Sequence, residues 1–267
     1  MGFQILYIGI KKWIGPMVGN YINPILGKQI ANSGRPSKNF MYRFIYNKIR
    51  QSSLSGKVVG DLACNDCRNI KFFEKNEISY WGFDYDRNIL KGAIQKSPDL
   101  NCVSCNLLTD ELPSSIFDLV ICTETIEHFG IQENKLKGVK NILTTLRSNA
   151  KFMINVHGHD ENEMIGALLS KKFKKIEKLP YRNFISQRYE RLLEVEGHIS
   201  VPKTNFKLTL HFIINWCLVC IEYLASYFKI KKSACVYFCD GHIGDYENQN
   251  IESFVISTGF NSPHELR

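Results

Sequence analysis

The chain has 267 residues, of which 44% are hydrophobic and 22% are charged. This composition excludes an intrinsically disordered chain and fits one large globular domain, or one domain with an extension. The net charge of +8 favours acidic partners or a membrane surface, but it does not choose between them.

The first 54 residues predict a helical N-terminal extension. Aromatic and basic side chains alternate there, and the turn-forming pairs Gly15-Pro16 and Asn23-Pro24 divide the segment into short helices. The extension could have a functional role, as a lid over a cofactor cleft or as a surface that contacts lipid headgroups. Alternatively, it only packs against the edge of a sheet. The first ten residues lack the basic start of a secretory signal.

Residues 58–84 have the pattern of a nucleotide-binding βαβ unit. An apolar strand at 58–62 is followed by a polar loop at 63–67, the start of a helix, and a second strand at 81–84. Asp84 lies 23 positions after Asp61, a spacing that suits a carboxylate that binds ribose hydroxyls. The loop contains no glycine, which argues against a dinucleotide-dependent oxidoreductase.

Helices and strands then alternate, as in a doubly wound α/β sheet. We expect helices at 88–96, 134–146 and 161–169, and strands at 101–107, 117–123, 151–156 and 173–179. Periodicity does not decide the structure of residues 181–204.

Residues 208–228 form an apolar stretch that contains no lysine or arginine. On a helical wheel its polar residues His211, Asn215, Glu222 and Ser226 share one stripe. Three interpretations of this stretch remain: a buried or lid helix, a helix that lies in the membrane interface, and a helix that spans the membrane. We favour the first, because the strand predicted at 233–239 has to pair into the same sheet as the earlier strands.

Nine cysteines include three C-x-x-C pairs, which invite a zinc site. The pairs are too far apart for a compact zinc finger, so we expect buried, reduced thiols and a cytoplasmic protein with possible peripheral membrane contact. The pairs are Cys64/Cys67, Cys102/Cys105 and Cys217/Cys220.

Five segments in order resemble the motifs of the class I S-adenosylmethionine (SAM) dependent methyltransferases, of the methyltransferase-11 or ubiquinone-biosynthesis-like group. They are 61–69, 82–86, 106–113, 117–128 and 146–154. In the first of them, Ala63, Asn65 and Cys67 stand where the family has glycine. The resemblance implies a Rossmann-like seven-stranded doubly wound sheet over residues 55–267, with an apolar helical insertion at about 205–230.

The resemblance also implies SAM as the cofactor and a set of residues that bind it. Asp84 would bind the ribose, Asp61 would orient the loop, and Asn106 would accept from the adenine amino group. The full predicted set is Asp61, Ala63, Asn65, Cys67, Asp84, Tyr85, Asn106, Leu107 and Thr123.

The segment Glu124-Thr125-Ile126-Glu127-His128 resembles the E-x-x-E-H end of the family's fourth strand. His128 or His157 is the predicted catalytic base. Glu124, Glu127 and His128 are weak candidates for a divalent metal site, with His157 or His159 as a further ligand, and we favour a pocket without metal.

The predicted function is methyl transfer to an oxygen of a small molecule, a glycan or a lipid-linked intermediate. One alternative is a catalytically silent, methyltransferase-like partner or scaffold protein, since the loop lacks glycine. The other is a nucleic-acid methyltransferase, which the positive charge suggests. No nucleic-acid-binding motif is present, so we expect no nucleic-acid partner. The sequence does not indicate an oligomeric state.

Overall fold

A computed structural model describes residues 35–73, 77–195, 198–199, 205–228 and 232–244, together with 251 and 254. The helices predicted before residue 35 therefore lie outside the described residues. The chain divides into two compact units, one made of residues 1–44 with 181–232 and the other of 45–180 with 233–267. The domain boundary expected near residue 54 stays a prediction.

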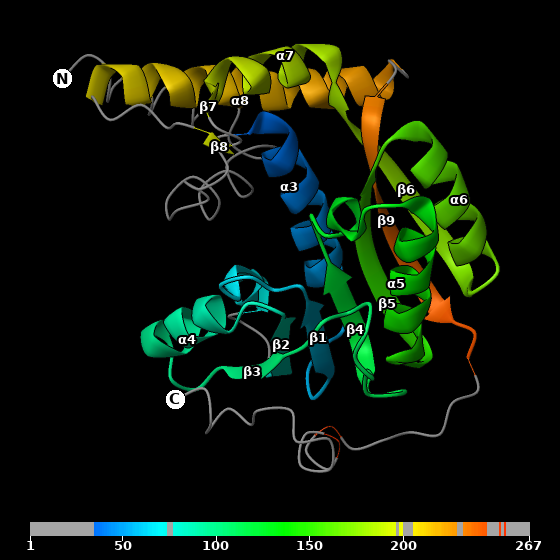
Figure 1. The fold of residues 1–267 in the computed structure, drawn as a ribbon. Helices are drawn as coiled ribbons and strands as arrows, with labels where there is room; N and C mark the ends of the chain where they lie inside the picture. Colours follow the sequence, from blue (N-terminus) through cyan, green and yellow to red (C-terminus); the bar gives the residue numbers. More distant parts are fainter. Residues whose placement is uncertain are drawn as a thin grey trace. The chain divides into compact units, whose positions relative to one another are not determined.

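A seven-stranded sheet is the frame of the protein (Figure 1). Its spatial order is β3-β2-β1-β4-β5-β9-β6. The pairs from β3 to β5 are parallel, whereas β9 runs antiparallel to β5. The bounds are β1 Val58–Leu62, β2 Ser79–Asp84, β3 Asn101–Ser104, β4 Phe117–Cys122, β5 Leu146–His157, β6 Phe173–Asn183 and β9 Lys232–His242. The predicted Rossmann-like, doubly wound sheet is confirmed.

Helices lie in several of the connections between these strands, whereas β3 leads to β4 through turns and irregular chain. These helices include the 3-10 helix η2 (Arg68–Phe73), α4 (Arg87–Lys96), the 3-10 helix η3 (Ile126–Phe129), α5 (Gln132–Thr144) and α6 (His159–Ser170). Asp86 starts α4, because its carboxylate accepts hydrogen bonds from the backbone N–H groups of Asn88 and Ile89. The helix expected directly after Cys67 is a short 3-10 helix, in which Asn69 is held by a hydrogen bond to Asp61.

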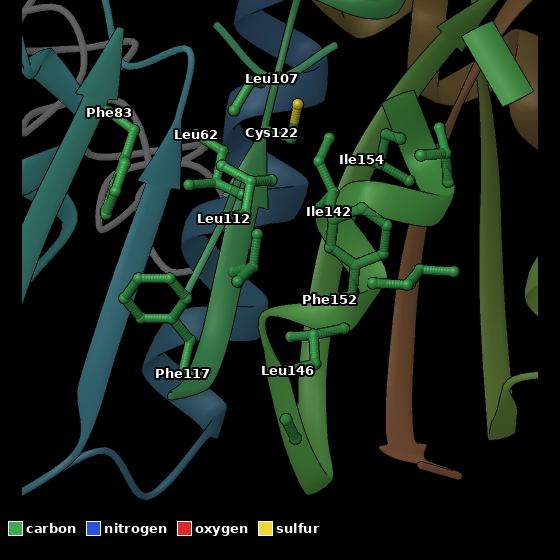
Figure 2. Packing of buried hydrophobic residues seen from close by; sticks show 14 of the residues in the cluster. Leu62, Phe83, Leu107, Leu112, Phe117, Cys122, Ile142, Leu146, Phe152 and Ile154 are labelled. Atoms are coloured by element: carbon green, nitrogen blue, oxygen red, sulfur yellow. The ribbon is translucent and has the colours of Figure 1, made fainter. Parts of the chain in front are cut away.

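The core lies between the sheet and its helices (Figure 2). Phe117 at the start of β4 is fully buried and makes an edge-on contact with Phe83 of β2, with 5.8 Å between ring centroids. Gly60 of β1 makes room for that ring, since a Cβ there would lie 2.9 Å from it. The apolar run predicted as a strand covered on both faces is therefore buried as expected.

In the part of the unit of residues 1–44 and 181–232 that the structure describes, the helices are α3 (Pro36–Gln51), which extends into the other unit, α7 (Phe184–Leu193) and α8 (Asn205–Tyr227). Two short strands, β7 (Glu194–Val195) and β8 (His198–Ile199), pair between α7 and α8. Asn39 of α3 donates to Asn215 of α8 at 3.0 Å. Periodicity left residues 181–204 undecided, and the structure shows α7, β7 and β8 in that segment.

Helix α8 is the predicted apolar helix before the last strand. Asn215 and Glu222, members of the polar stripe, are buried. Glu222 accepts from the backbone N–H of Asn183 at 2.8 Å and lies 3.4 Å from the Lys232 ammonium. None of the helices in the described parts of the chain combines the length and the hydropathy that crossing a membrane requires.

The nine cysteines are free thiols. Seven of them are buried, as predicted, but Cys217 of α8 is exposed and Cys220 is half-buried. The expectation of buried thiols is therefore wrong for Cys217, which lies on the helix face opposite the polar stripe.

Candidate active site

The carboxyl ends of the parallel strands meet at one edge of the sheet. The strand register aligns Asp61 with Gly82, Asp84 with Ser104, and Cys122 with Ile154. The residues that follow these strands therefore gather along one edge, which is where α/β sheets of this kind bind ligands.

The loop after β1 has a left-handed backbone conformation of the kind that glycine usually adopts. Ala63, Asn65 and Cys67 have φ angles of +62°, +53° and +55°. These left-handed angles fall on every second residue, at the three positions where the sequence lacks the expected glycines. The side chains at these positions therefore do not prevent the loop from adopting the left-handed turns.

The thiol of Cys67 points into the protein and not out of the loop. Its Sγ lies 3.4 Å from Sγ of Cys64 and 3.5 Å from Sγ of Cys102. Gly82 of β2 provides the space, because a Cβ there would lie 2.6 Å from Sγ of Cys67. Burial raises the pKa of Cys64 to about 11, so this thiol is protonated at neutral pH.

Asp84, at the end of β2, connects the loop to the following helix. Its Oδ2 accepts from the backbone N–H of Asn65 at 2.8 Å, and its Oδ1 accepts from that of Asp86 at 3.0 Å. A carboxylate offers about four acceptor positions, so these two bonds leave capacity for a ligand. The side chain is buried at the sheet edge, where the loop backbone fixes its orientation.

Asp61 lies beneath the loop and is fully buried. It accepts from the Tyr80 hydroxyl at 2.5 Å and from the Asn69 amide at 3.2 Å. Burial raises its pKa to about 6, against the lowering effect of these hydrogen bonds. These contacts connect β1 to β2 and η2, so the contribution of Asp61 to the site is to position the loop.

The other predicted cofactor residues differ in exposure. Tyr85 is 76% exposed directly after Asp84, while Thr123 and Leu107 are buried. Asn106 is exposed, and its carbonyl accepts from the backbone N–H of Leu108 at 3.0 Å, which closes a local turn. Leu107 belongs to the hydrophobic core, as Figure 2 shows.

A second group of polar side chains follows β4 and β5. Glu124 has a left-handed φ of +57°, and its backbone N–H donates to Oδ1 of Asn155 at 2.6 Å. The Asn155 amide nitrogen donates to Oε1 of Glu124 at 2.8 Å. Nε2 of His157 lies 3.4 Å from Glu124 Oε1 and 3.7 Å from Glu127 Oε1. Asn155 thus fixes Glu124 against His157.

Among the residues that the structure describes, Glu124, Glu127 and His157 form the group whose donor atoms could hold a metal ion. Two carboxylates and one imidazole suit a divalent cation. His128, the third residue of the predicted metal set, is exposed and is not a member of this group. His159 is also exposed, near Asp160 and Glu163.

Comparison with known proteins agrees with this geometry. The family model described as "Methyltransferase domain" matches residues 60–154, which run from β1 into β5 and include Asp61, Asp84 and Glu124. The chain contains a SAM-dependent methyltransferase domain. No curated protein matches the chain.

Solved structures share the fold of the methyltransferase domain at low sequence identity. A chain of the complex between the Haloferax volcanii Trm112 methyltransferase activator and a methyltransferase is 10% identical, with a TM-score of 0.50 over 78% of this chain and 91% of that one. A TehB-like SAM-dependent methyltransferase from Corynebacterium glutamicum is 18% identical, with a TM-score of 0.42 over 53% and 84%. The N-methyltransferase NodS from Bradyrhizobium japonicum, in complex with S-adenosyl-l-homocysteine, is 12% identical, with a TM-score of 0.43 over 55% and 82%.

Sequence reasoning missed the supporting roles of three residues of the methyltransferase domain, although Gly82 lies in the matched segment 82–86. Tyr80 and Gly82 lie inside β2, where they read as ordinary strand residues. Asn155 is a polar residue near the carboxyl end of the apolar strand β5. Its place at this end of the strand is the one sequence signal that could have indicated its role in the site. Their partners come from other strands, so their roles depend on tertiary contacts.

Proposed function

We propose that this edge of the sheet binds SAM and catalyses methyl transfer to an oxygen of a small molecule, a glycan or a lipid-linked intermediate. The observation that carries the proposal is the loop of residues 63–67. Its left-handed backbone at Ala63, Asn65 and Cys67, fixed by Asp84, supports a cofactor-binding turn in a chain without the glycines.

In this proposal Asp84 binds the ribose and Tyr85 covers the adenine. The carboxylate of Asp84 accepts from the ribose hydroxyls with its remaining acceptor positions, in charge-assisted bonds of about 1.5–3 kcal/mol each. The exposed ring of Tyr85 offers an aromatic face on which adenine can stack. The Asn106 carbonyl can accept from the adenine amino group if its local turn opens.

The chain's task in the reaction is to align the acceptor and to remove its proton. SAM, when bound, supplies an activated methyl group on a sulfonium sulfur. His157 takes the proton of the acceptor hydroxyl as the oxygen attacks. Glu124 and Glu127, whose Oε1 atoms lie 3.4 and 3.7 Å from Nε2 of His157, balance the positive charge that the imidazole acquires.

We propose this role for His157 without a metal ion. The backbone N–H of Glu124 bonds to the Asn155 oxygen, so the amide nitrogen has to face the other way. It lies 2.8 Å from Glu124 Oε1 and 3.1 Å from His157 Nε2, which are two of the atoms that a cation would need. A hydrogen-bond donor between these two ligand atoms disfavours a cation there.

Isothermal titration with SAM or S-adenosylhomocysteine tests the cofactor assignment. We expect binding by the unmodified chain, no detectable binding by Asp84→Ala, and binding about ten- to a hundredfold weaker by Asp84→Asn, which keeps the shape but loses the charge. Asp99→Ala, which removes an exposed acid outside the site, is the matched control.

The outcomes separate the alternatives. No heat from the unmodified protein would favour the silent partner protein. Unchanged affinity of Asp84→Asn and Asp84→Ala would refute the ribose assignment.

Transfer of labelled methyl from SAM to extracted small molecules, glycans and lipids identifies the acceptor class. With that acceptor, His157→Asn should lower kcat about 10²- to 10⁴-fold and leave SAM binding unchanged.

A further inference from the structure

Helix α7 exposes an apolar and basic face. Phe184, Ile185, Arg188, Arg191 and Leu192 are all exposed, and their spacing of one, four, seven and eight residues places them on one side of the helix. Leu192 is 83% exposed and Phe184 66%. The guanidinium of Arg188 lies over the Phe184 ring at 5.5 Å. The opposite side carries the buried residues Ser186 and Glu190.

Helix α8 is apolar on both its buried and its exposed side, and the polar residues described on it lie on the buried side. Its buried side includes Asn215 and Glu222, whereas its exposed side carries Ile213, Cys217 and Leu224. The last three lie four and seven residues apart, so they form one apolar row. Leu218, Val219 and Ala225 are buried as well, so the exposed row is apolar surface in addition to the apolar side that packs inside the unit.

The two helices lie side by side in the same compact unit (Figure 1). Their acidic residues face inward. Glu190 accepts from Ser37 and from Arg182, and Glu222 accepts from the backbone N–H of Asn183. Of the charged side chains that the structure describes on α7 and α8, the exposed ones are Arg188 and Arg191. The outer charge of this pair of helices is therefore positive.

We propose that the exposed faces of α7 and α8 bind the surface of an anionic lipid bilayer. Large apolar side chains flanked by arginines are typical of helices that lie in the membrane interface, where the apolar groups enter the acyl boundary and the basic groups meet lipid phosphates. The chain's net charge of +8 adds to the attraction. These residues belong to the unit of residues 1–44 and 181–232, whereas the candidate active-site residues belong to the other unit, and the proposal does not depend on the proposed function.

A bilayer fits these faces better than a protein partner does. The apolar residues form two convex helical rows, and a flat, deformable surface can meet convex rows without a matching groove. The positive outer charge opposes the docking of a second copy of the same face, because Arg188 and Arg191 of two copies would approach each other.

Co-sedimentation of the full chain with vesicles tests the proposal. We expect binding to phosphatidylcholine vesicles that contain roughly one-third phosphatidylglycerol, weak binding to pure phosphatidylcholine, and a loss of binding as salt is raised. Arg188→Glu with Arg191→Glu should lower the partition coefficient about tenfold or more. Leu192→Asp should also lower it, because the apolar residue enters the acyl boundary.

Matched controls come from α5 of the other unit and from the residue that precedes this helix. Lys137 and Lys140 are exposed with the same three-residue spacing, so Lys137→Glu with Lys140→Glu makes the same change of charge. Ile131→Asp, at a residue that is 65% exposed, matches Leu192→Asp. The control variants should keep their vesicle binding, and circular dichroism verifies the fold of every variant.

Three results would overturn the proposal: equal binding to neutral and anionic vesicles, an equal loss of binding in the α5 controls, or oligomers of the unmodified chain that Leu192→Asp disperses in analytical ultracentrifugation. The last result would identify the face as an interface between copies. The salt response of the unmodified chain needs no variant, so a misfolded variant does not prevent the test.

Discussion

At the scale of single residues, the loop after β1 adopts left-handed backbone angles at three residues that are not glycine. Ala63 and Cys67 are the two least suited to a left-handed backbone, whereas asparagine tolerates it better than most residues. The burial of the Cys67 thiol beside Cys64 and Cys102 compensates part of the strain, since the side chain gains contacts that glycine would lack.

The strain at Ala63 predicts that glycine stabilises the protein there. Relief of the left-handed Ala63 exceeds the added unfolded-state entropy, so Ala63→Gly should raise the free energy of unfolding by about 0.5–1 kcal/mol. Asn65→Gly should change it little. Ala167→Gly, in the exposed part of helix α6, should lower it by about 1 kcal/mol. Urea denaturation measures all three, and a loss of stability in Ala63→Gly would contradict the argument.

Asp61 predicts a pH dependence of stability. Its pKa is about 6 in the folded protein and near 3.9 in an unfolded chain, so the folded state holds the proton more tightly. The stabilising contribution of this group is therefore complete below about pH 4 and is lost as the pH rises to about 6, with a total of about 3 kcal/mol.

Asp61→Asn tests this dependence because asparagine does not titrate. The difference in unfolding free energy between the two proteins should slope between about pH 4 and pH 6 and be flat above that range. The same difference at every pH would show that Asp61 has an ordinary pKa. Asp99→Asn, at an exposed acid, is the control and should give no such slope.

At the scale of elements, β2 and the loop are fitted to each other. Tyr80 and Asp84 of β2 bond to Asp61 and to the backbone of Asn65, and Gly82 between them accommodates the thiols of the loop. One strand thus fixes the loop from the interior and from the sheet edge. Such a match arises between residues about 20 apart, and no local pattern encodes it.

Gly82→Ala tests the fit between strand and loop. The added Cβ would lie 2.6 Å from Sγ of Cys67 and 2.9 Å from Sγ of Cys64, so we expect a loss of about 1–3 kcal/mol of stability. Cys67→Ala in the same chain should recover part of that loss. A double-mutant cycle from urea denaturation measures the coupling, and strictly additive effects would refute the contact.

At the scale of the whole molecule, the chain combines an α/β sheet unit with a helical unit built from distant segments. The helical unit contains buried polar pairs, namely Asn39 with Asn215 and Glu222 with Lys232. Buried charges are tolerated when they are paired and hydrogen-bonded. These pairs fix which segments of the unit meet, while one apolar row on each of α7 and α8 remains exposed.

The Glu222–Lys232 pair predicts a large effect on stability. Both side chains are almost fully buried, with exposed fractions of 0% and 1%. Glu222→Leu would leave the Lys232 ammonium buried without its counter-charge, at a loss of about 3–5 kcal/mol. Glu222→Leu with Lys232→Met should recover much of it. Thermal unfolding measures both, and a larger loss in the double variant than in the single one would contradict this account.

The sequence by itself determined the α/β sheet, its doubly wound order and the position of the candidate site. The reason is that strand and helix periodicity are local, and the carboxyl ends of parallel strands have to share one edge. It also pointed to Asp84, Glu124 and His157 as candidate site residues, because each lies at or just after the carboxyl end of an apolar strand; their roles stay predictions.

Only the tertiary structure decided how these residues are held. It grouped His157, and not His128, with Glu124 and Glu127, and it showed Asp61 buried under the loop. It revealed α7 and turned the apolar row of α8 outward. Each of these outcomes depends on contacts between segments far apart in the chain, where packing and the pairing of buried polar groups override local preference.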